Sequence, residues 1–318
     1  MIASRIALTA LALASAASLA LPLAAASADA PAVVRVGATG NDTAAEVYYA
    51  DDLGLFKKRG LTVQIQNLRN GAAEAAAVAG GALDVGEQNV VSMSHAHEKG
   101  LPFKFIAPAG EYVSTASTTS LVVAKTSAIK TGKDLEGKTL AVNALGDLTQ
   151  IGASAWVEKH GGDPAKVKFI EMPAAEIGAA VGRGTIDAGV IPEPSLTMAE
   201  DAGQVKVLAQ PYDAIADRFM INGWFASEDW VKKNPATAKK FVDAIYEAGK
   251  WANAHRSESA KILDKHSRAD AAVIARMRRA VYGERFDAKA LQNVVEAAVH
   301  FKALGKSFNA GDLIDANL

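Results

Sequence analysis

The stretch Gly184-Thr185-Ile186-Asp187-Ala188-Gly189 has an earlier counterpart in Gly81-Ala82-Leu83-Asp84-Val85-Gly86. Both follow the pattern Gly-x-aliphatic-Asp-x-Gly, and both lead into a segment typical of the exit of a β-strand. The spacing between the two copies is too large for the unit of a solenoid and is about the size of a domain. The sequence therefore predicts two similar α/β lobes with a ligand between them.

Two further pairs of segments repeat in the same register. Residues 36–41 (Val-Gly-Ala-Thr-Gly-Asn) match residues 142–147 (Val-Asn-Ala-Leu-Gly-Asp), and residues 103–107 match residues 205–209. Strand patterns alternate with helical patterns between these segments, which indicates parallel pairing with right-handed crossovers. We expect lobe 1 to comprise residues 29–115 and 217–318, including the C-terminal helices, and lobe 2 to comprise residues 116–216. Residues 110–119 and 211–218 would be the two crossings.

Composition narrows the class of protein. The chain has 318 residues, half of them hydrophobic, which is enough for about two domains with cores of their own. Its formal net charge is −1, which gives no electrostatic reason to expect nucleic acid or an anionic membrane surface as a partner.

The first residues resemble an export signal. One positive charge at Arg5 precedes the uncharged Ala/Leu-rich run 6–23, and Ala26-Ser27-Ala28 fits the small-x-small cleavage rule. We therefore predict that residues 1–28 are a signal peptide, with a retained membrane anchor as the alternative. The chain contains no cysteine, which excludes a lipid-anchored cysteine, disulfides, thiolate metal sites and a cysteine nucleophile. The mature chain should be soluble in an exported compartment.

Ligands of parallel α/β sheets bind outside the carboxyl ends of the strands, near helix N-termini. The loops at these positions hold amide, hydroxyl, glycine and carboxylate groups, and Arg69 is their one notable basic residue. An anion could still bind backbone N–H groups at the helix starts near Thr43, Gly71 and Asp147. The candidate ligand-binding residues are Asn41, Thr43, Gly71, Gln88, Asn89, Tyr112, Gly146, Asp147, Thr149, Gln150 and Glu193.

Each candidate has a structural alternative. Thr43 and Asp147 would also serve as helix caps, and the spacing Thr43-Ala44-Ala45-Glu46 is that of a capping box opening a helix through Leu53. Glu193, fixed between two prolines, would touch the ligand or cap the helix that starts at Ser195. Tyr112 would stack on the ligand or fill the hinge.

Signals of catalysis are weak. The six histidines are scattered, and His95 and His97 stand two apart on a predicted helix, where they point to different faces. No Gly-rich phosphate loop, nucleophile elbow or metalloprotease motif is present in the sequence. We therefore expect no catalytic residues, no metal site and no cofactor.

Several longer segments carry a family resemblance. They are Leu53-Gly54-Leu55-Phe56-Lys57-Lys58-Arg59-Gly60-Leu61, the Gly-x-x-Asp-x-Gly segment at 81–86, Asp134-Leu135-Glu136-Gly137-Lys138, and Asp187-Ala188 leading to Glu193-Pro194. Together they resemble substrate-binding proteins of ABC importers, in the nitrate/sulfonate/taurine-binding (NMT1/SsuA-like) group. The resemblance covers nearly the whole mature chain.

This resemblance implies a type II periplasmic-binding fold that closes over one solute and delivers it to an ABC permease from the periplasm. It also implies a monomer, with the Glu193 loop and the helix start at 147–150 facing the cleft. Many relatives carry a tryptophan just before the Glu-Pro pair, where this chain has Ile191-Pro192. That departure argues against a taurine-type pocket. The expected solute is a small organic anion or zwitterion of the sulfonate, nitrate, aromatic or other carboxylate class.

Two alternatives share the fold. One is an enzyme similar to those of thiamine-pyrimidine synthesis, whose chemistry is associated with a cysteine-rich motif and an intracellular setting. The lack of cysteine and the predicted export signal argue against it. The other is a periplasmic ligand sensor, which would bind a solute but act on a membrane receptor instead of a permease.

Overall fold

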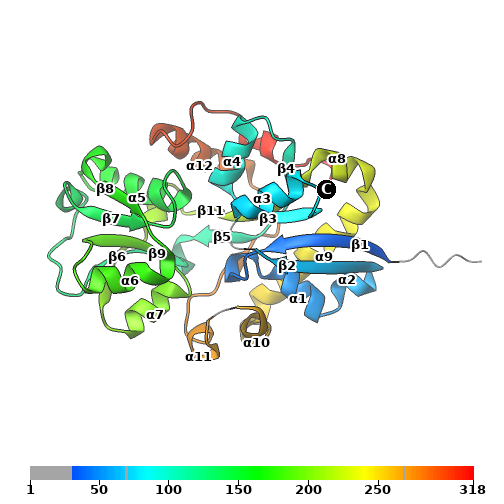
Figure 1. Cartoon of the computed structure of the whole chain (residues 1–318), viewed down its shortest axis with the longest axis horizontal. Coiled ribbons are helices and arrows are strands. Elements are labelled where there is room, and N and C mark those ends of the chain that lie inside the picture. Colours follow the sequence, from blue (N-terminus) through cyan, green and yellow to red (C-terminus); the bar gives the residue numbers. More distant parts are fainter. Residues whose placement is uncertain (1–30, 69–70, 268) are drawn as a thin grey trace, which may run out of the picture. The chain divides into compact units, whose positions relative to one another are not determined.

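The computed structural model describes residues 31–68, 71–267 and 269–318. The predicted signal peptide and the loop residues Arg69 and Asn70 lie outside these ranges. The described chain is an α/β protein with two five-stranded sheets and one small three-stranded sheet (Figure 1). None of its described helices has both the length and the apolar character that a membrane crossing requires.

The first sheet combines early strands with one late strand. Its members are β1 (Ala32–Ala38), β2 (Leu61–Asn67), β3 (Val85–Asn89), β4 (Phe103–Pro108) and β12 (Asn222–Ser227). The spatial order is β2-β1-β3-β12-β4. β1 is parallel to β2 and β3, whereas β12 is antiparallel to both β3 and β4.

The second sheet repeats this plan. Its members are β6 (Thr119–Ala124), β7 (Thr139–Val142), β8 (Lys168–Glu171), β9 (Ala188–Pro192) and β10 (Val205–Ala209). The order β8-β7-β9-β6-β10 matches the first sheet strand for strand. β7 is parallel to β8 and β9, and β6 is antiparallel to β9 and β10.

The strand orders confirm the repeat that the sequence predicts. The paired segments fall on equivalent strands: β1 with β7, β3 with β9, and β4 with β10. The predicted parallel direction holds for four strands of each sheet, and one antiparallel strand is inserted in each. That strand is the first one to enter the sheet after a crossing, β6 in one case and β12 in the other.

The aspartate of the repeated motif has the same role in both sheets. Asp84 Oδ2 accepts the backbone N–H of Arg35 at 2.8 Å, and Asp84 donates its own N–H to the Arg35 carbonyl. Asp187 Oδ2 likewise accepts the N–H of Thr139 at 2.9 Å and donates to the Thr139 carbonyl. Each aspartate therefore fastens the start of the third strand to the first strand, and the repeated motif is a structural element.

The two predicted crossings pair with each other. β5 (Gly110–Val113) is antiparallel to β11 (Arg218–Met220) and to β13 (Val281–Tyr282), which gives the order β11-β5-β13. Each crossing contains a short strand, which was not predicted from the sequence. Backbone pairing therefore links the two crossings to each other.

Helices cover the sheets, and the C-terminal ones pack on the first. In the core of the first sheet, the ring of Phe56 stacks on that of Phe241 with centroids 5.5 Å apart. The α-helices are α1 (Glu46–Asp52), α2 (Leu55–Lys58), α3 (Gly71–Ala79), α4 (Val90–Glu98), α5 (Leu148–Lys159), α6 (Ala174–Gly182), α7 (Ser195–Asp201), α8 (Glu228–Lys233), α9 (Pro235–Ala254), α10 (Arg256–His266), α11 (Ala271–Ile274) and α12 (Ala288–His300).

The capping box predicted at Thr43 is wrong. A 3₁₀ turn, η1 (Asp42–Ala44), comes first, and α1 begins at Glu46 with Ala45 as its N-cap. Glu46 does not reach back to cap the helix, because its side chain is buried, with 1% of the residue exposed. Asp147 does occupy the N-cap of α5, without a side-chain hydrogen bond to that helix's first N–H groups in the described structure.

Candidate functional site

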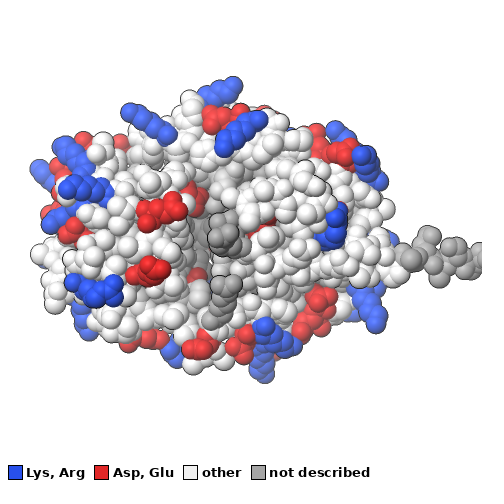
Figure 2. All heavy atoms as spheres, in the orientation of Figure 1, with Lys and Arg blue, Asp and Glu red and all other residues white. Residues whose placement is uncertain are grey.

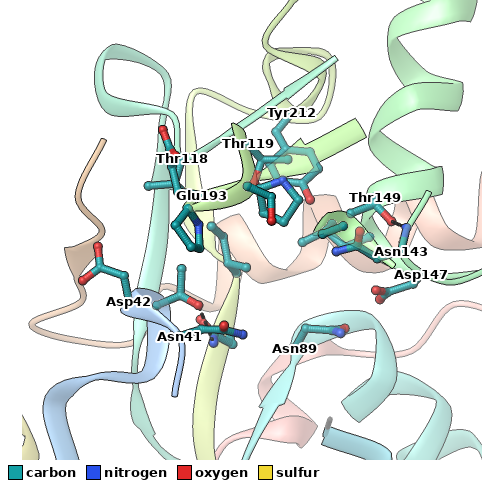
Figure 3. Close-up of a pocket in the computed structure, with 18 residues that line it drawn as sticks. Asn41, Asp42, Asn89, Thr118, Thr119, Asn143, Asp147, Thr149, Glu193 and Tyr212 are labelled. Atoms are coloured by element: carbon teal, nitrogen blue, oxygen red, sulfur yellow. Dashed lines mark hydrogen bonds between the residues drawn. The ribbon is translucent and has the colours of Figure 1, made fainter. Parts of the chain in front are cut away.

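A cavity of about 270 Å³ opens at facing edges of the two large sheets (Figure 3). The exits of β1, β3, β7 and β9 contribute Asn41, Asn89, Asn143 and Pro192–Ser195 to its wall. The remaining lining residues are Asp42, Thr43, Thr118, Thr119, Asp147, Leu148, Thr149, Ala174, Tyr212, Ile221 and Asn222. This volume lies just below the range of about 300–1,000 Å³ that is usual for small-molecule sites. The cavity suits a compact solute.

Some of the residues predicted from sequence come together here. Asn41, Thr43, Asn89, Asp147, Thr149 and Glu193 line the cavity. They come from the loops that follow strands of both sheets, as the rule for parallel strands leads one to expect.

The other five predicted residues lie elsewhere. Gln88 is buried and donates from Nε2 to the carbonyl of Gly71 at 3.2 Å. Tyr112 packs against Tyr212 and Phe219, and its hydroxyl donates to Asp213 at 2.5 Å. The N–H of Gly146 donates to Gln150 Oε1 at 2.7 Å, and Gln150 borders a separate hollow beside α12. Their visible contacts are structural.

Several lining residues were missed because they begin antiparallel strands. Asn222 is the first residue of β12 and is the register partner of Asn89, the last residue of β3. Thr119 opens β6 in the same way and faces Pro192 at the end of β9. An antiparallel strand starts where its parallel neighbours end, so its first residues share their edge. A sequence analysis that considers only strand exits overlooks them.

Asp42 is held in a buried ion pair on one wall. The guanidinium of Arg279 donates from Nε to both carboxylate oxygens at 3.0 Å, and the backbone N–H of Ala280 donates at 2.6 Å. The hydroxyl of Tyr282 donates to Asp42 Oδ1 at 3.0 Å. The side chains of Asp42 and Arg279 are 4% and 9% exposed, so the charge of Asp42 is matched inside the protein.

Glu193 is similarly engaged on the opposite wall. Its Oε2 accepts the N–H of Thr197 at 3.0 Å, within the first turn of α7. Its Oε1 accepts the backbone N–H of Arg278 at 3.2 Å and the guanidinium of Arg278 at 3.3 Å. Arg278 also pairs with Glu200 at 3.0 Å. Glu193 therefore caps α7, as one sequence interpretation proposed, and its charge is matched by Arg278.

Asp147 differs from the other two lining carboxylates. Among the described residues it has no ion-pair partner, and its Oδ1 atom is buried without a hydrogen-bond partner. Burial raises the pKa of its carboxyl group, and the nearby N–H of Leu148 and the side-chain amide of Asn89 oppose that rise. The Asn89 side chain uses its oxygen to accept the N–H of Ser92, which leaves its amide N–H₂ for Asp147. Figure 3 shows the Asp147 carboxylate directed toward the space beside Asn143 and Asn89.

Three further carboxylates are buried behind the first wall. Glu46, Glu74 and Glu87 are 1%, 0% and 6% exposed. Burial raises the pKa of each of them, and that of Glu74 reaches about 9, with the nearby charge of Glu87 adding to the effect. The Nδ2 group of Asn222 donates to Glu87, so this carboxylate orients a lining amide.

Glu74 makes the stability of the protein depend on pH. Its pKa is about 9 in the folded protein against an ordinary value of 4.5, so the folded state retains a proton that the unfolded chain releases. The stability that this retained proton contributes is complete below about pH 4.5 and is lost as the pH rises toward 9. We expect Glu74→Gln, which cannot ionise, to leave Tm nearly unchanged at pH 5 and to raise it by several degrees at pH 8.5.

Scanning calorimetry from pH 5 to pH 9 measures this difference. The control is Glu247→Gln, because the Glu247 side chain is half exposed and pairs with Arg59 at the surface. Equal pH slopes for the Glu74→Gln variant and the unmodified protein would contradict the prediction.

The lining of the cavity combines polar groups with apolar surface, and among the described residues no lysine or arginine belongs to it. Nor does any group of three or more His, Asp or Glu side chains in the described ranges have the arrangement of a metal site. The described site offers hydroxyl, amide and carboxylate groups, which bind a solute through hydrogen bonds and charge.

Comparisons with known proteins agree with this architecture. A sequence model of the family described as NMT1/THI5 like matches residues 41–259, more than half of the chain. A Bacillus subtilis (strain 168) protein that carries the name "Putative binding protein YtlA" is 25% identical over 216 residues, covering 67% of this chain and 64% of that protein. The chain thus matches less than two thirds of that relative's length.

Solved structures show the same fold. The periplasmic aliphatic sulphonate binding protein SsuA from Escherichia coli superposes with a TM-score of 0.74 at 21% identity, covering 86% of this chain and 92% of SsuA. The periplasmic nitrate-binding protein NrtA from Synechocystis PCC 6803 gives a TM-score of 0.73 at 15% identity, covering 90% of this chain and 86% of NrtA. The relatives named here are binding proteins. The chain belongs to the NMT1/THI5-like family and has the fold of the periplasmic binding proteins.

Proposed function

We propose that this protein is an exported, monomeric solute-binding protein that captures one small solute in the cavity and delivers it to an ABC permease. The observation that carries the proposal is the cavity itself: equivalent strand ends of two repeated sheets line it with polar groups. The family match and the names of the relatives support solute binding. Delivery to a permease follows from the function that such proteins have in import systems.

The two predicted lobes would close on the solute. Lobe 1 is residues 29–115 and 217–318, and lobe 2 is residues 116–216, so the cavity lies between them. Solute contacts that form only when both walls meet shift the protein toward the closed conformation. A small organic anion or zwitterion is the solute expected from the family resemblance, and the polarity of the lining fits the zwitterion better than the anion.

Filling the cavity is the direct test of this function. We expect a thermal-shift screen of the mature protein to find a solute class that raises Tm; a solute at a hundred times its Kd stabilises by about 2.7 kcal/mol. Ala174 lines the cavity at the start of α6, so Ala174→Trp should abolish the shift by occupying the site.

The matched control is Ala236→Trp, at an exposed position in the first turn of α9. This variant should retain the shift. A solute that stabilises both variants equally binds outside the cavity and contradicts the assignment. Turnover of the solute would instead support an enzyme of the same fold.

A further inference from the structure

Figure 2 shows the distribution of charge around the hollow between the two halves of the protein. On this face, the lysines and arginines of the described chain lie toward the margins, and carboxylates lie closer to the hollow. Inside it, Asp42, Asp147 and Glu193 line the cavity. Arg279 matches Asp42 and Arg278 matches Glu193, which leaves Asp147 as the lining carboxylate without an ion-pair partner among the described residues.

The unpaired hydrogen-bonding groups of the cavity lining are acceptors, which likewise favours a solute that donates hydrogen bonds. Three buried oxygen atoms of lining residues have no hydrogen-bond partner in the described structure: Asn143 Oδ1, Asp147 Oδ1 and Asn222 Oδ1. Asn222 is 4% exposed, and its Nδ2 group is bound by Glu87, so its free group is an acceptor. A buried acceptor without a partner destabilises the protein, and a donor from the solute would supply the missing hydrogen bond.

Three helix starts at the cavity, those of α4, α5 and α7, offer little to an anion. Such N-termini are favourable for negative charge, but here the chain supplies the negative groups itself. Glu193 accepts an N–H of α7, and Asp147 occupies the N-cap of α5. The oxygen of Asn89 caps α4 by accepting the N–H of Ser92. A solute anion would compete with these groups and lie close to the carboxylate of Asp147.

We propose that the solute carries N–H donors on an ammonium, amidinium, guanidinium or amino-heterocycle group, which binds Asp147, Asn143 and Asn222. The proposal rests on the solute-binding function proposed above and specifies its ligand. The hydroxyl oxygens of Thr43 and Thr149 accept from Asn222 Nδ2 and from the N–H of Asn143, each at 3.3 Å, so each hydroxyl keeps its O–H to donate to a second, negative group of a zwitterion. A zwitterion therefore satisfies the site, whereas a simple sulfonate, nitrate or carboxylate without N–H donors does not. A titratable side chain close to Asp147 is His95, whose Nε2 lies 3.5 Å from the carbonyl oxygen of Gly146.

A matched series of small aromatic probes separates charge from hydrogen bonding. Benzamidine has positive charge and N–H donors, benzamide has N–H donors without charge, phenyltrimethylammonium has charge without N–H donors, and benzoate and benzenesulfonate are anions. The series is run by thermal shift and calorimetry beside a broader panel of amines, guanidines, amino-heterocycles, amino acids, carboxylates, sulfonates and nitrate. We expect N–H donors to stabilise the protein and anions to have no effect, with benzamidine the strongest of the aromatic series.

Substitutions then locate the donor site. Asp147→Asn should weaken binding of a cationic hit at least tenfold while leaving binding of a neutral N–H donor within a few-fold. Asn143→Leu, which keeps Asp147, should weaken both kinds of hit. Asp243→Asn is the control, because Asp243 lies on the exposed face of α9 and pairs with Lys239.

The outcomes distinguish this inference from the function on which it rests. Stabilisation by an anion without N–H donors, and by no donor, would overturn the ligand class and leave solute binding intact. Unchanged affinity of a donor hit in both Asp147→Asn and Asn143→Leu would overturn the assigned site. No stabilisation by any class would contradict the proposed function, and the ligand class with it.

Discussion

Replacing Arg279 with methionine is expected to lower the free energy of unfolding by about 3–5 kcal/mol, the usual cost of removing one partner of a buried ion pair. The side chain of Asp42 is 4% exposed, so its carboxylate cannot recover hydration once Arg279 is gone. The remaining donors, the Ala280 N–H and the hydroxyls of Tyr49 and Tyr282, carry no charge. Urea denaturation of the mature protein at neutral pH measures the loss.

Two further variants identify the cause. Lys233→Met removes an exposed ion pair with Asp229, whose side chains are both about 70% exposed, and should cost well under about 1 kcal/mol. The double variant Arg279→Met/Asp42→Asn should recover part of the loss, because no unpaired charge then remains in the interior. If Arg279→Met is no more destabilising than Lys233→Met, the ion pair does not stabilise the fold as argued.

The repeated strand order of the two large sheets could be predicted because the sequence segments that form the strands also repeat. The motif that contains Asp84 and Asp187, and the segments that align in register with it, are local patterns, and a local pattern is visible without coordinates. The same local reasoning located the strand exits at Asn41, Asn89 and Glu193, since parallel strands place their exits at one edge. These residues all line the cavity.

Pairings between distant segments could not be predicted in this way. Arg279 binds Asp42 across 237 positions of the chain, and Arg278 reaches Glu193 across 85. Their motif, Arg276-Met277-Arg278-Arg279, gives no sign of which carboxylates it meets. Asn222 was missed for a related reason: its strand, β12, belongs to the first sheet but comes after all the strands of the second sheet along the chain.

Glycine and amide signals near strand exits were less specific than expected. Gln88 and Asn89 are neighbours on β3, so their side chains point to opposite faces, and only Asn89 reaches the cavity. The N–H of Gly146 donates to the side chain of Gln150, four residues later, so these two residues bind each other. A polar residue at a strand exit therefore has to face the edge shared with the opposite sheet before it can bind a solute.

The segment that contains Arg278 and Arg279 joins both walls of the cavity. Arg279 holds Asp42 beside the first sheet, and the adjacent Arg278 holds Glu193 and Glu200 beside the second. Because Glu193 has a side chain that is 2% exposed, its contact with Arg278 is largely shielded from water. These contacts should favour the arrangement in which the two walls are close, and that arrangement is the one that encloses a solute.

Arg278→Ala is therefore expected to raise the Kd of the bound solute roughly ten- to a hundred-fold, since hydrogen bonds to charged groups contribute about 1.5–3 kcal/mol. The backbone N–H of Arg278 keeps its contact with Glu193, so α7 retains its cap and the fold should persist. Isothermal titration with a solute from the screen measures the change. Arg276→Ala is the matched control, because Arg276 pairs with Asp201 where both side chains are about half exposed. Equal Kd values for the two variants would mean that the contact between Arg278 and Glu193 stabilises the fold without assisting closure.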